Sequence, residues 1–175
     1  QLRAYPTEHQ KLILSQWMGC ARFIWNAKCD EDKYFRGFAS KFTPFSDYYK
    51  TQDQKYSHFK SDELSAWLKD CPSTIQKNST VNWFNTLKKS IKGLCGRPKR
   101  KKKTDKGSIY LTSDLFEFRT ENKKRKLFIG GKKFNIGALN FKAHADFNEP
   151  KSLYIRKERG QYFISFCYED GLEQD

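Results

Sequence analysis

Residues 2–26, LRAYPTEHQKLILSQWMGCARFIWN, decide the fold of this 175-residue chain because they join a strand to a long helix. The first four residues alternate as in a short β-strand, and Pro6 ends it. Thr7 and Gln10 have the spacing of a capping box, in which the hydroxyl accepts from a free amide of the first turn and the glutamine reaches back. Apolar residues then recur at steps of three and four, which predicts a helix to about Tyr34.

The middle of the chain is expected to be helical. Residues 38–60 show no clear periodicity and predict a loop or a broken helix. A short helix is expected over residues 61–68. Ser73 and Gln76 form a second capping box, and the apolar spacing behind them predicts a helix whose buried face extends to Leu94.

The last third of the chain has the apolar period of two that is typical of strands. Gly130-Gly131 has the composition of a two-residue hairpin turn. A lone strand of about five residues at the N-terminus is unstable by itself, so we expect it to pair with the C-terminal strands. This makes the fold class α+β, with the helices inserted into a β-barrel. The expected strands are 108–112, 115–119, 126–129, 132–136, 152–157 and 161–168.

Positive charge is concentrated in a quarter of the chain. The net charge is +14, and residues 88–133 hold 17 basic and 4 acidic residues. Charge of this density repels itself unless a polyanion neutralises it, and phosphate backbones are the usual partner. The alternative is a solvated linker. Aromatic residues interleaved with the charge favour nucleic acid.

No catalytic constellation is visible in the sequence. Three histidines are far apart and have no carboxylate at ligand spacing, and no nucleotide-binding loop, nucleophile elbow or zinc-protease motif is present. The acidic clusters at 30–32 and 169–170 indicate a helix surface and a solvated end. We therefore expect no enzyme activity and no metal or other cofactor in this chain.

Composition excludes two further classes of protein. No stretch approaches the roughly 18 apolar residues of a membrane span, and no signal peptide opens the chain. The five cysteines are scattered and form no C-x-x-C pair, which argues against a disulfide scaffold or a compact zinc site. A reducing cytoplasm is the expected location, without a membrane partner.

Arg22 and Asn26 are four residues apart on one side of the first predicted helix. They can form a hydrogen bond on the helix surface, or they can face a phosphate backbone. Both interpretations fit the spacing.

Five segments, taken in order, resemble the TnpB/OrfB proteins of bacterial insertion sequences. Residues 5–10 and the GCARFIWN of 19–26 resemble the family's opening. WLKDCPS at 67–73 is similar to its W-L-K-E-V-P-S type segment. The basic tail after Gly-Arg-Pro at 96–98 is similar to its G-x-P-R-F-K segment, although lysines replace the aromatic residue. Residues 153–168 are similar to the hairpin that precedes the family's nuclease domain.

The resemblance implies an RNA-guided DNA endonuclease whose N-terminal half is a wedge, an OB-like β-barrel with a helical recognition bundle inserted after its first strand. Residues 1–6 would be the first wedge strand, 7–106 the recognition insertion with its basic tail, and 107–170 the rest of the wedge. The RuvC-like nuclease and zinc ribbon are expected only in a C-terminal half beyond Asp175, together with their magnesium and zinc.

The resemblance also implies which residues bind. Those expected to contact a transposon-adjacent DNA motif are Ser73, Thr74, Lys77, Thr112, Ser113 and Phe45. Charge and position along the chain, rather than the resemblance, indicate the residues expected to contact guide RNA or phosphate, which are Arg22, Asn26, Arg97, Lys99, Arg100, Lys101, Lys102 and Lys103. The alternatives are a stand-alone DNA-binding repressor or accessory transposition factor, and a gene remnant without function.

Overall fold

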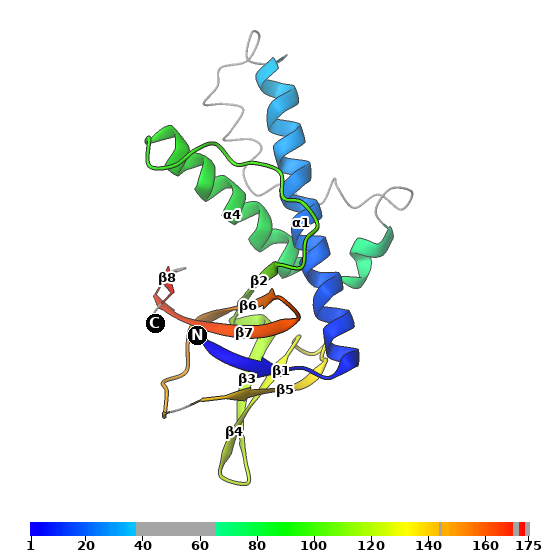
Figure 1. Cartoon of the computed structure of the whole chain (residues 1–175), viewed down its shortest axis with the longest axis vertical. Coiled ribbons are helices and arrows are strands. Elements are labelled where there is room, and N and C mark those ends of the chain that lie inside the picture. The colour runs from blue at the N-terminus through cyan, green and yellow to red at the C-terminus, as the bar shows by residue number, and fades with distance from the viewer. Residues whose placement is uncertain (38–65, 144, 170–171, 174–175) are drawn as a thin grey trace. The chain divides into compact units, whose positions relative to one another are not determined.

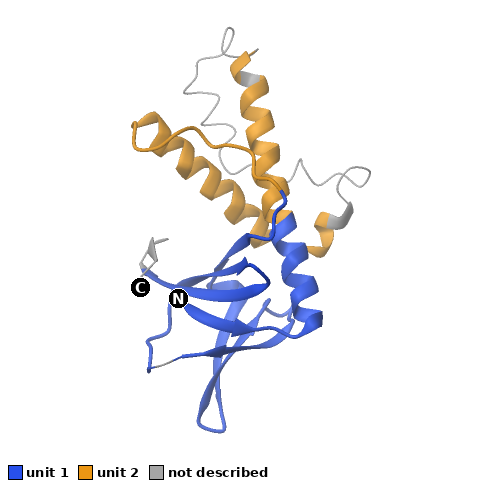
Figure 2. Ribbon diagram, in the orientation of Figure 1, with its two compact units in different colours: residues 1–19, 103–175 blue, residues 20–102 orange. Residues whose placement is uncertain are grey.

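The computed structural model describes the whole chain except residues 38–65, 144, 170–171 and 174–175. Two compact units are present, coloured separately in Figure 2: residues 1–19 with 103–175, and residues 20–102. We call them the β unit and the helical unit. Helix α1 (Glu8–Gly37) contributes its start to the first and the remainder to the second. The loop predicted at 38–60 and most of the helix predicted at 61–68 lie outside the described residues.

The β unit is one antiparallel sheet that curls into a half-barrel (Figure 1). The strand order is β2-β6-β7-β1-β5-β4-β3, and β8 also pairs with β7. A short 3-10 turn, η4 (Ser113–Leu115), joins β2 to β3. The strands are β1 (Leu2–Tyr5), β2 (Gly107–Thr112), β3 (Phe116–Glu121), β4 (Lys124–Ile129), β5 (Gly137–Lys142), β6 (Ser152–Glu158), β7 (Gln161–Glu169) and β8 (Leu172–Glu173).

Strand β1 lies between two strands from the other end of the chain. Its residue Ala4 is opposite Phe141 of β5 on one side and Tyr162 of β7 on the other. The prediction that the first strand pairs with C-terminal strands is therefore confirmed, and so is the α+β class.

The start of α1 is fixed by the first predicted capping box. The backbone N–H of Thr7 donates to Gln10 Oε1 at 2.9 Å, and the backbone N–H of Gln10 donates to Thr7 Oγ1 at 3.2 Å. Gln10 Nε2 also donates to the carbonyl oxygens of Ile136 and Ala138, at 3.0 and 2.9 Å. One buried side chain thus holds both the helix and the edge of β5.

The core of the β unit lies on one face of the sheet. Ile109, Ile155 and Ile164 are in register across β2, β6 and β7, and all three are buried. On the same face, a Cβ added at Gly107 would lie 2.8 Å from the sulfur of Met18, so α1 covers this side. The alternate residues of these strands form the opposite, outer face.

The turns on either side of β4 correct the sequence prediction. Gly130-Gly131 does not form a two-residue hairpin, and 132–136 is not a strand. The N–H of Ile136 instead donates to the carbonyl of Ile129 at 2.9 Å, which closes a longer loop before β5. The tight turn of this region is Asn122-Lys123, where both residues have positive φ and join β3 to β4.

The helical unit consists of the second part of α1, a 3-10 turn η3 (Ala66–Asp70) and helix α4 (Ser73–Ile91). The rings of Trp25 and Trp83 form its core with Leu87. Ser79 Oγ of α4 donates to the carbonyl of Ala21 at 2.6 Å, so hydrogen bonds as well as apolar contacts join α4 to α1.

The second predicted capping box is wrong. Pro72 occupies the N-cap position of α4 and makes no side-chain capping hydrogen bond. The buried amide of Gln76 donates to the carbonyls of Leu68 and Cys71, which satisfies two acceptors of the preceding turn. The helix also ends earlier than expected, at Ile91, because Gly93 takes a positive φ of 78°.

The apolar face predicted for this helix is correspondingly shorter. Ile91 and Leu94, which the spacing placed on that face, are exposed.

Candidate nucleic-acid interface

Residues 97–103, here called the basic segment, follow α4 and return along α1 (Figure 1). The indole N–H of Trp25 donates to the carbonyl of Lys99 at 2.7 Å. The amide of Asn26 makes two bonds with the backbone of Lys101: Nδ2 donates to the carbonyl at 2.9 Å, and Oδ1 accepts from the N–H at 2.7 Å. These three bonds fix the backbone of the segment against the helix.

Two carboxylates of α1 hold the arginines of the basic segment. Asp32, whose side chain is 4% exposed, accepts from Arg97 Nε and Nη2 at 3.2 and 3.0 Å. Arg36 Nε donates to the same carboxylate. Arg100 pairs with Asp30. Because Arg97 lies beside Asp32 and Lys101 beside Asn26, the segment runs antiparallel to α1.

The lysines of the segment keep their charge available. Lys99, Lys102 and Lys103 are exposed, and none has a carboxylate partner in the part of the chain that the structure describes. The ammonium of Lys101 lies 3.9 Å from the ring centroid of Trp25, and desolvation lowers the pKa of Lys101. The two arginines thus anchor the segment, and its exposed lysines carry positive charge along an anchored backbone.

The structure brings most of the predicted phosphate-binding residues together and gives some of them a second role. Asn26, Arg97 and Arg100 hold the segment itself, so their contact with nucleic acid stays a prediction. Arg22 is half-buried on α1, one turn before Asn26. Lys103 begins the C-terminal part of the β unit.

Sequence reasoning missed the anchors of this segment. The acidic cluster at 30–32 was expected on a helix surface, but Asp32 is buried and binds Arg97. The signal that could have found it is charge complementarity: an acidic cluster on a helix and one dense basic run in the same chain.

The residues predicted to read a DNA motif fall in two places. Ser73, Thr74 and Lys77 are in the first turns of α4, where Ser73 and Lys77 are exposed. Thr112 ends β2, its hydroxyl donates to Asp114 Oδ1 at 2.6 Å, and Ser113 follows in η4. The two groups belong to different units, and their contact with one DNA motif stays a prediction. Phe45 lies outside the described residues.

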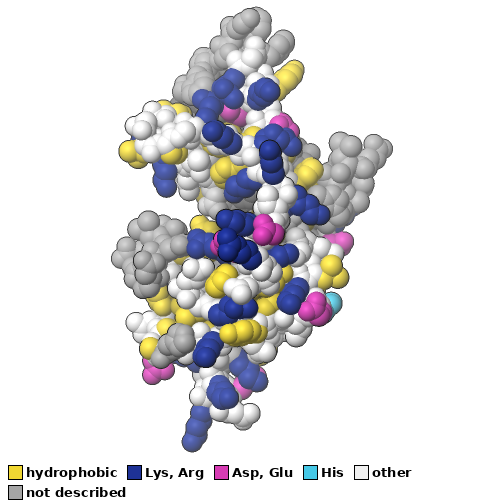
Figure 3. Space-filling model, in the orientation of Figure 1, with side chains coloured by type: hydrophobic (Ala, Val, Ile, Leu, Met, Phe, Trp, Pro, Cys, Tyr) yellow, Lys and Arg dark blue, Asp and Glu magenta, His cyan; other side chains and the backbone are white. Residues whose placement is uncertain are grey.

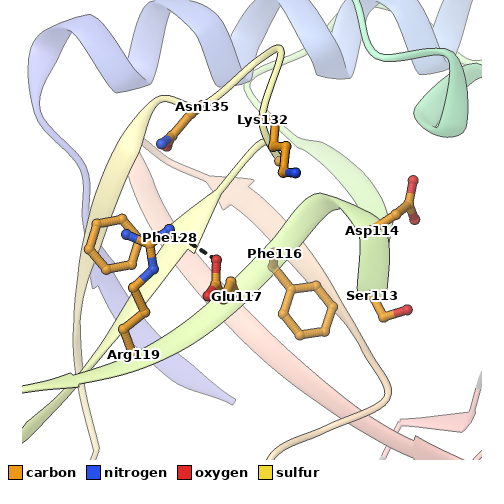
Figure 4. A pocket seen from close by; sticks show the side chains of 9 residues that line it. Ser113, Asp114, Phe116, Glu117, Arg119, Phe128, Lys132 and Asn135 are labelled. Atoms are coloured by element: carbon orange, nitrogen blue, oxygen red, sulfur yellow. Dashed lines mark hydrogen bonds and ion pairs between the residues drawn. The ribbon is translucent and has the colours of Figure 1, made fainter.

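Ser113 lines a cleft of about 530 Å³ in the β unit (Figure 4). Arg119 lies over the ring of Phe128, 4.3 Å from its centroid, and donates to Glu117 at 3.0 Å. This hydrogen bond lowers the pKa of the Glu117 carboxyl. Because Arg119 and Glu117 neutralise each other, the cleft offers hydrogen-bonding groups rather than a catalytic acid–base pair. The other lining residues are Asp114, Phe116, Gly131, Lys132 and Asn135.

The described residues form neither a metal-binding cluster nor a membrane-spanning helix. They contain no group of three or more His, Cys, Asp or Glu side chains placed to hold a metal ion. None of their helices is both long and apolar enough to cross a membrane.

Residues 1–28 match a family model described as a helix-turn-helix domain, of the IS605 OrfB type. The match indicates a transposon-associated protein of the nucleic-acid-binding class. Over these residues the chain is similar to the TnpB/OrfB family of insertion sequences. In this structure the matched residues form β1 and one uninterrupted helix, most of α1. The comparison with curated proteins finds no match.

Proposed function

We propose that the chain is the nucleic-acid-binding N-terminal module of a TnpB-like, transposon-encoded RNA-guided DNA endonuclease. The basic segment binds guide RNA and the heteroduplex that it forms with target DNA. The curled sheet is the OB-like wedge, and the helical unit is the recognition bundle inserted after β1. The match over residues 1–28 and the charge of the basic segment support this proposal.

The ordered basic segment is the observation that carries the proposal. Fixing the backbone of one residue costs about 1–2 kcal/mol of conformational entropy. A solvated linker stays unordered and avoids this cost. Here Trp25, Asn26 and Asp32 hold the segment through neutral and charged hydrogen bonds. An ordered backbone is useful where the lysines of the segment must contact phosphates at fixed positions.

Recognition of the DNA motif is assigned to two groups of short polar side chains. Ser73, Thr74 and Lys77 are at the start of α4, and Thr112 and Ser113 are at the end of β2. An RNA-guided effector delegates most sequence reading to base pairing, so a few protein contacts are sufficient. We assign no catalytic step, magnesium or zinc to this chain, and we place the protein in the cytoplasm.

The salt dependence of RNA binding tests the proposal. If about six phosphates are neutralised, the logarithm of the binding constant falls with the logarithm of salt with a slope of about −4 to −5. Replacing Lys99, Lys102 and Lys103 with Gln leaves the anchoring bonds intact. It should flatten the slope by about 2–3 units, because each lost phosphate contact contributes about 0.7–0.9.

The control is a second triple variant with the same change in net charge, Lys33, Lys69 and Lys151 to Gln. These lysines are exposed and lie outside the basic segment. Their replacement should leave the slope nearly unchanged. Equal slopes for the wild type and the basic-segment variant would contradict the proposal.

A second candidate is a stand-alone DNA-binding repressor or accessory transposition factor. The observation in its favour is that the matched family model is described as a helix-turn-helix domain. Such a protein binds a specific DNA duplex more tightly than RNA at the same salt concentration. We expect the proposed module to bind RNA more tightly than a DNA duplex under the same conditions.

A further inference from the structure

The outer face of the sheet in the β unit carries a row of cationic and aromatic side chains. Arg156 of β6 is directly opposite Phe163 of β7, Phe163 is opposite Arg3 of β1, and Arg3 is opposite Lys142 of β5. These residues alternate with the buried core positions, so they share the face turned away from the core. Neighbouring strands are about 4.8 Å apart, so the row spans about 14 Å.

More aromatic rings lie beside this row. Two residues before Arg156, the ring of Tyr154 lies 4.7 Å from that of Tyr110, and the Arg156 guanidinium lies 5.2 Å from the Tyr154 centroid. Tyr5, two residues after Arg3, is 50% exposed. On the visible face of the β unit, hydrophobic and Lys or Arg side chains are interspersed (Figure 3).

Arg3 is the residue that points to a ligand. Its guanidinium lies over two rings, 5.2 Å from the centroid of Tyr5 and 5.8 Å from that of Phe163. Its Nε is buried and has no hydrogen-bond partner. No carboxylate pairs with it among the described residues. A cation without a counter-ion, held between rings, is suited to an anion bound over the same face.

We propose that this face binds single-stranded RNA. Unpaired bases stack on Tyr5, Tyr154 and Phe163, and Arg3 and Lys142 contact the phosphates. A sheet with aromatic side chains on one face can stack two or three bases in this way. The proposal adds a second surface to the function proposed above, and it rests on that function for the class of partner.

The chemistry of the face favours RNA over a protein partner. The outward positions on β1, β6 and β7 between Arg3 and Tyr154 carry aromatic, cationic and hydroxyl groups and no aliphatic side chain. A protein-docking face of this size would be expected to have a more apolar centre. The hydroxyl group of Tyr5, a residue that is 50% exposed, can both donate and accept, as contact with a ribose 2′-OH requires.

The test compares two arginine–aromatic pairs of the same sheet. Phe163→Leu and Arg3→Gln alter the proposed site. Phe128→Leu and Arg119→Gln alter a pair of similar geometry in which Glu117 already neutralises the arginine. The probe is an unstructured RNA of about ten nucleotides that contains 2-aminopurine, whose fluorescence falls when the base stacks. Affinity and quenching are measured on the full chain.

We expect Phe163→Leu and Arg3→Gln to weaken single-stranded RNA binding by about fivefold to a hundredfold and to abolish the quenching, since one stacked base contributes about 1–3 kcal/mol. The Phe128 and Arg119 variants should change affinity by less than about twofold. If the Phe163 variant does not fold, Tyr5→Leu replaces it, because Tyr5 is half exposed.

Unchanged affinity and quenching in the Arg3 and Tyr5 variants would overturn the inference. So would equal binding of single-stranded DNA of the same sequence, or an equal loss in the control variants. The proposed function is tested independently of the sheet variants. It is contradicted if replacing Lys99, Lys102 and Lys103 leaves the salt dependence of RNA binding unchanged.

Discussion

Replacing Asn26 with alanine should release the basic segment from α1. The substitution removes both hydrogen bonds to the backbone of Lys101, at 2.9 and 2.7 Å, and leaves the ion pairs of the segment in place. A hydrogen bond contributes about 0.5–1.5 kcal/mol net. The Lys101 backbone groups are at the surface and can bond to water instead, so we expect about 1–2 kcal/mol for the pair.

Amide hydrogen exchange measures this loss directly. A change of 1.4 kcal/mol in local opening corresponds to a tenfold change in protection. The Lys101 N–H should therefore exchange about five to thirty times faster in the variant, whereas amides in the middle of α4 keep their rates. The unfolding midpoint of the whole chain should move less than the local rate.

Alkylation of Cys29 provides a second readout of the same opening. Its Sγ accepts from the Trp83 indole at 3.2 Å and lies 3.7 Å from the carbonyl oxygen of Pro98. Burial raises the pKa of the Cys29 thiol, so less reactive thiolate is present at pH 8 than in an exposed cysteine. Detaching the segment lowers that pKa and speeds the reaction, with exposed Cys95 as internal reference.

The matched control is Asn85→Ala, on the exposed side of α4. It should leave Lys101 exchange and Cys29 alkylation unchanged. Wild-type exchange at Lys101 in a folded Asn26→Ala variant would refute the reasoning, because the two bonds would then contribute nothing to the position of the segment.

Three further predictions concern other parts of the chain. Gln10→Ala should lower the free energy of unfolding by about 2–4 kcal/mol in urea titrations, because it removes a cap and leaves the partly buried carbonyls of Ile136 and Ala138 without this donor; a loss below about 0.5 kcal/mol would contradict this. Gly130→Ala should cost more than about 2 kcal/mol in the same assay, since φ is 109° and a Cβ would lie 2.0 Å from a backbone oxygen, whereas Gly96→Ala, with open space around it, should be nearly neutral. Lys77→Ala and Thr112→Ala should each weaken binding to motif-bearing duplex by about 1–3 kcal/mol without affecting RNA affinity, and an equal loss on a scrambled duplex would show that neither reads sequence.

The elements that depend on neighbouring residues could be predicted from the sequence. Thr7 and Gln10 form their capping box because the two side chains and the two amides lie within one turn. The pairing of β1 followed from a general constraint, since a short lone strand needs partners. The capping box is a property of one local segment, and the pairing of β1 needed only the instability of a short lone strand.

The sequence predictions were wrong where contacts between distant residues determine the local structure. Gly130-Gly131 has the composition of a tight turn, yet the N–H of Gly130 donates to the carbonyl of Leu115, fifteen residues away, and the loop stays open. Conversely, Lys123 at a φ of 64° gives no sign of a turn in the sequence. The spacing from Ser73 predicts a capping role for Gln76, yet its amide donates to the carbonyls of Leu68 and Cys71 in the preceding turn.

The candidate site shows the same division. Charge density alone predicted the basic segment, because net charge is visible without a fold. Its anchoring by Asn26 and Asp32 could not be predicted, since those contacts join residues 75 and 65 positions apart. The sequence does not show that Arg97 and Arg100 form ion pairs while lysines of the segment stay exposed. That distinction requires the positions of Asp30 and Asp32 relative to the segment.

The central claim is that this module binds RNA through a segment held on α1. A competition experiment tests it most directly, with the full chain, a structured RNA and a DNA duplex of the same sequence at one salt concentration. We expect RNA to displace the duplex at least tenfold more effectively, and this preference to shrink when Lys99, Lys102 and Lys103 are replaced with Gln. Tighter binding of the duplex, unaffected by those replacements, would contradict the account.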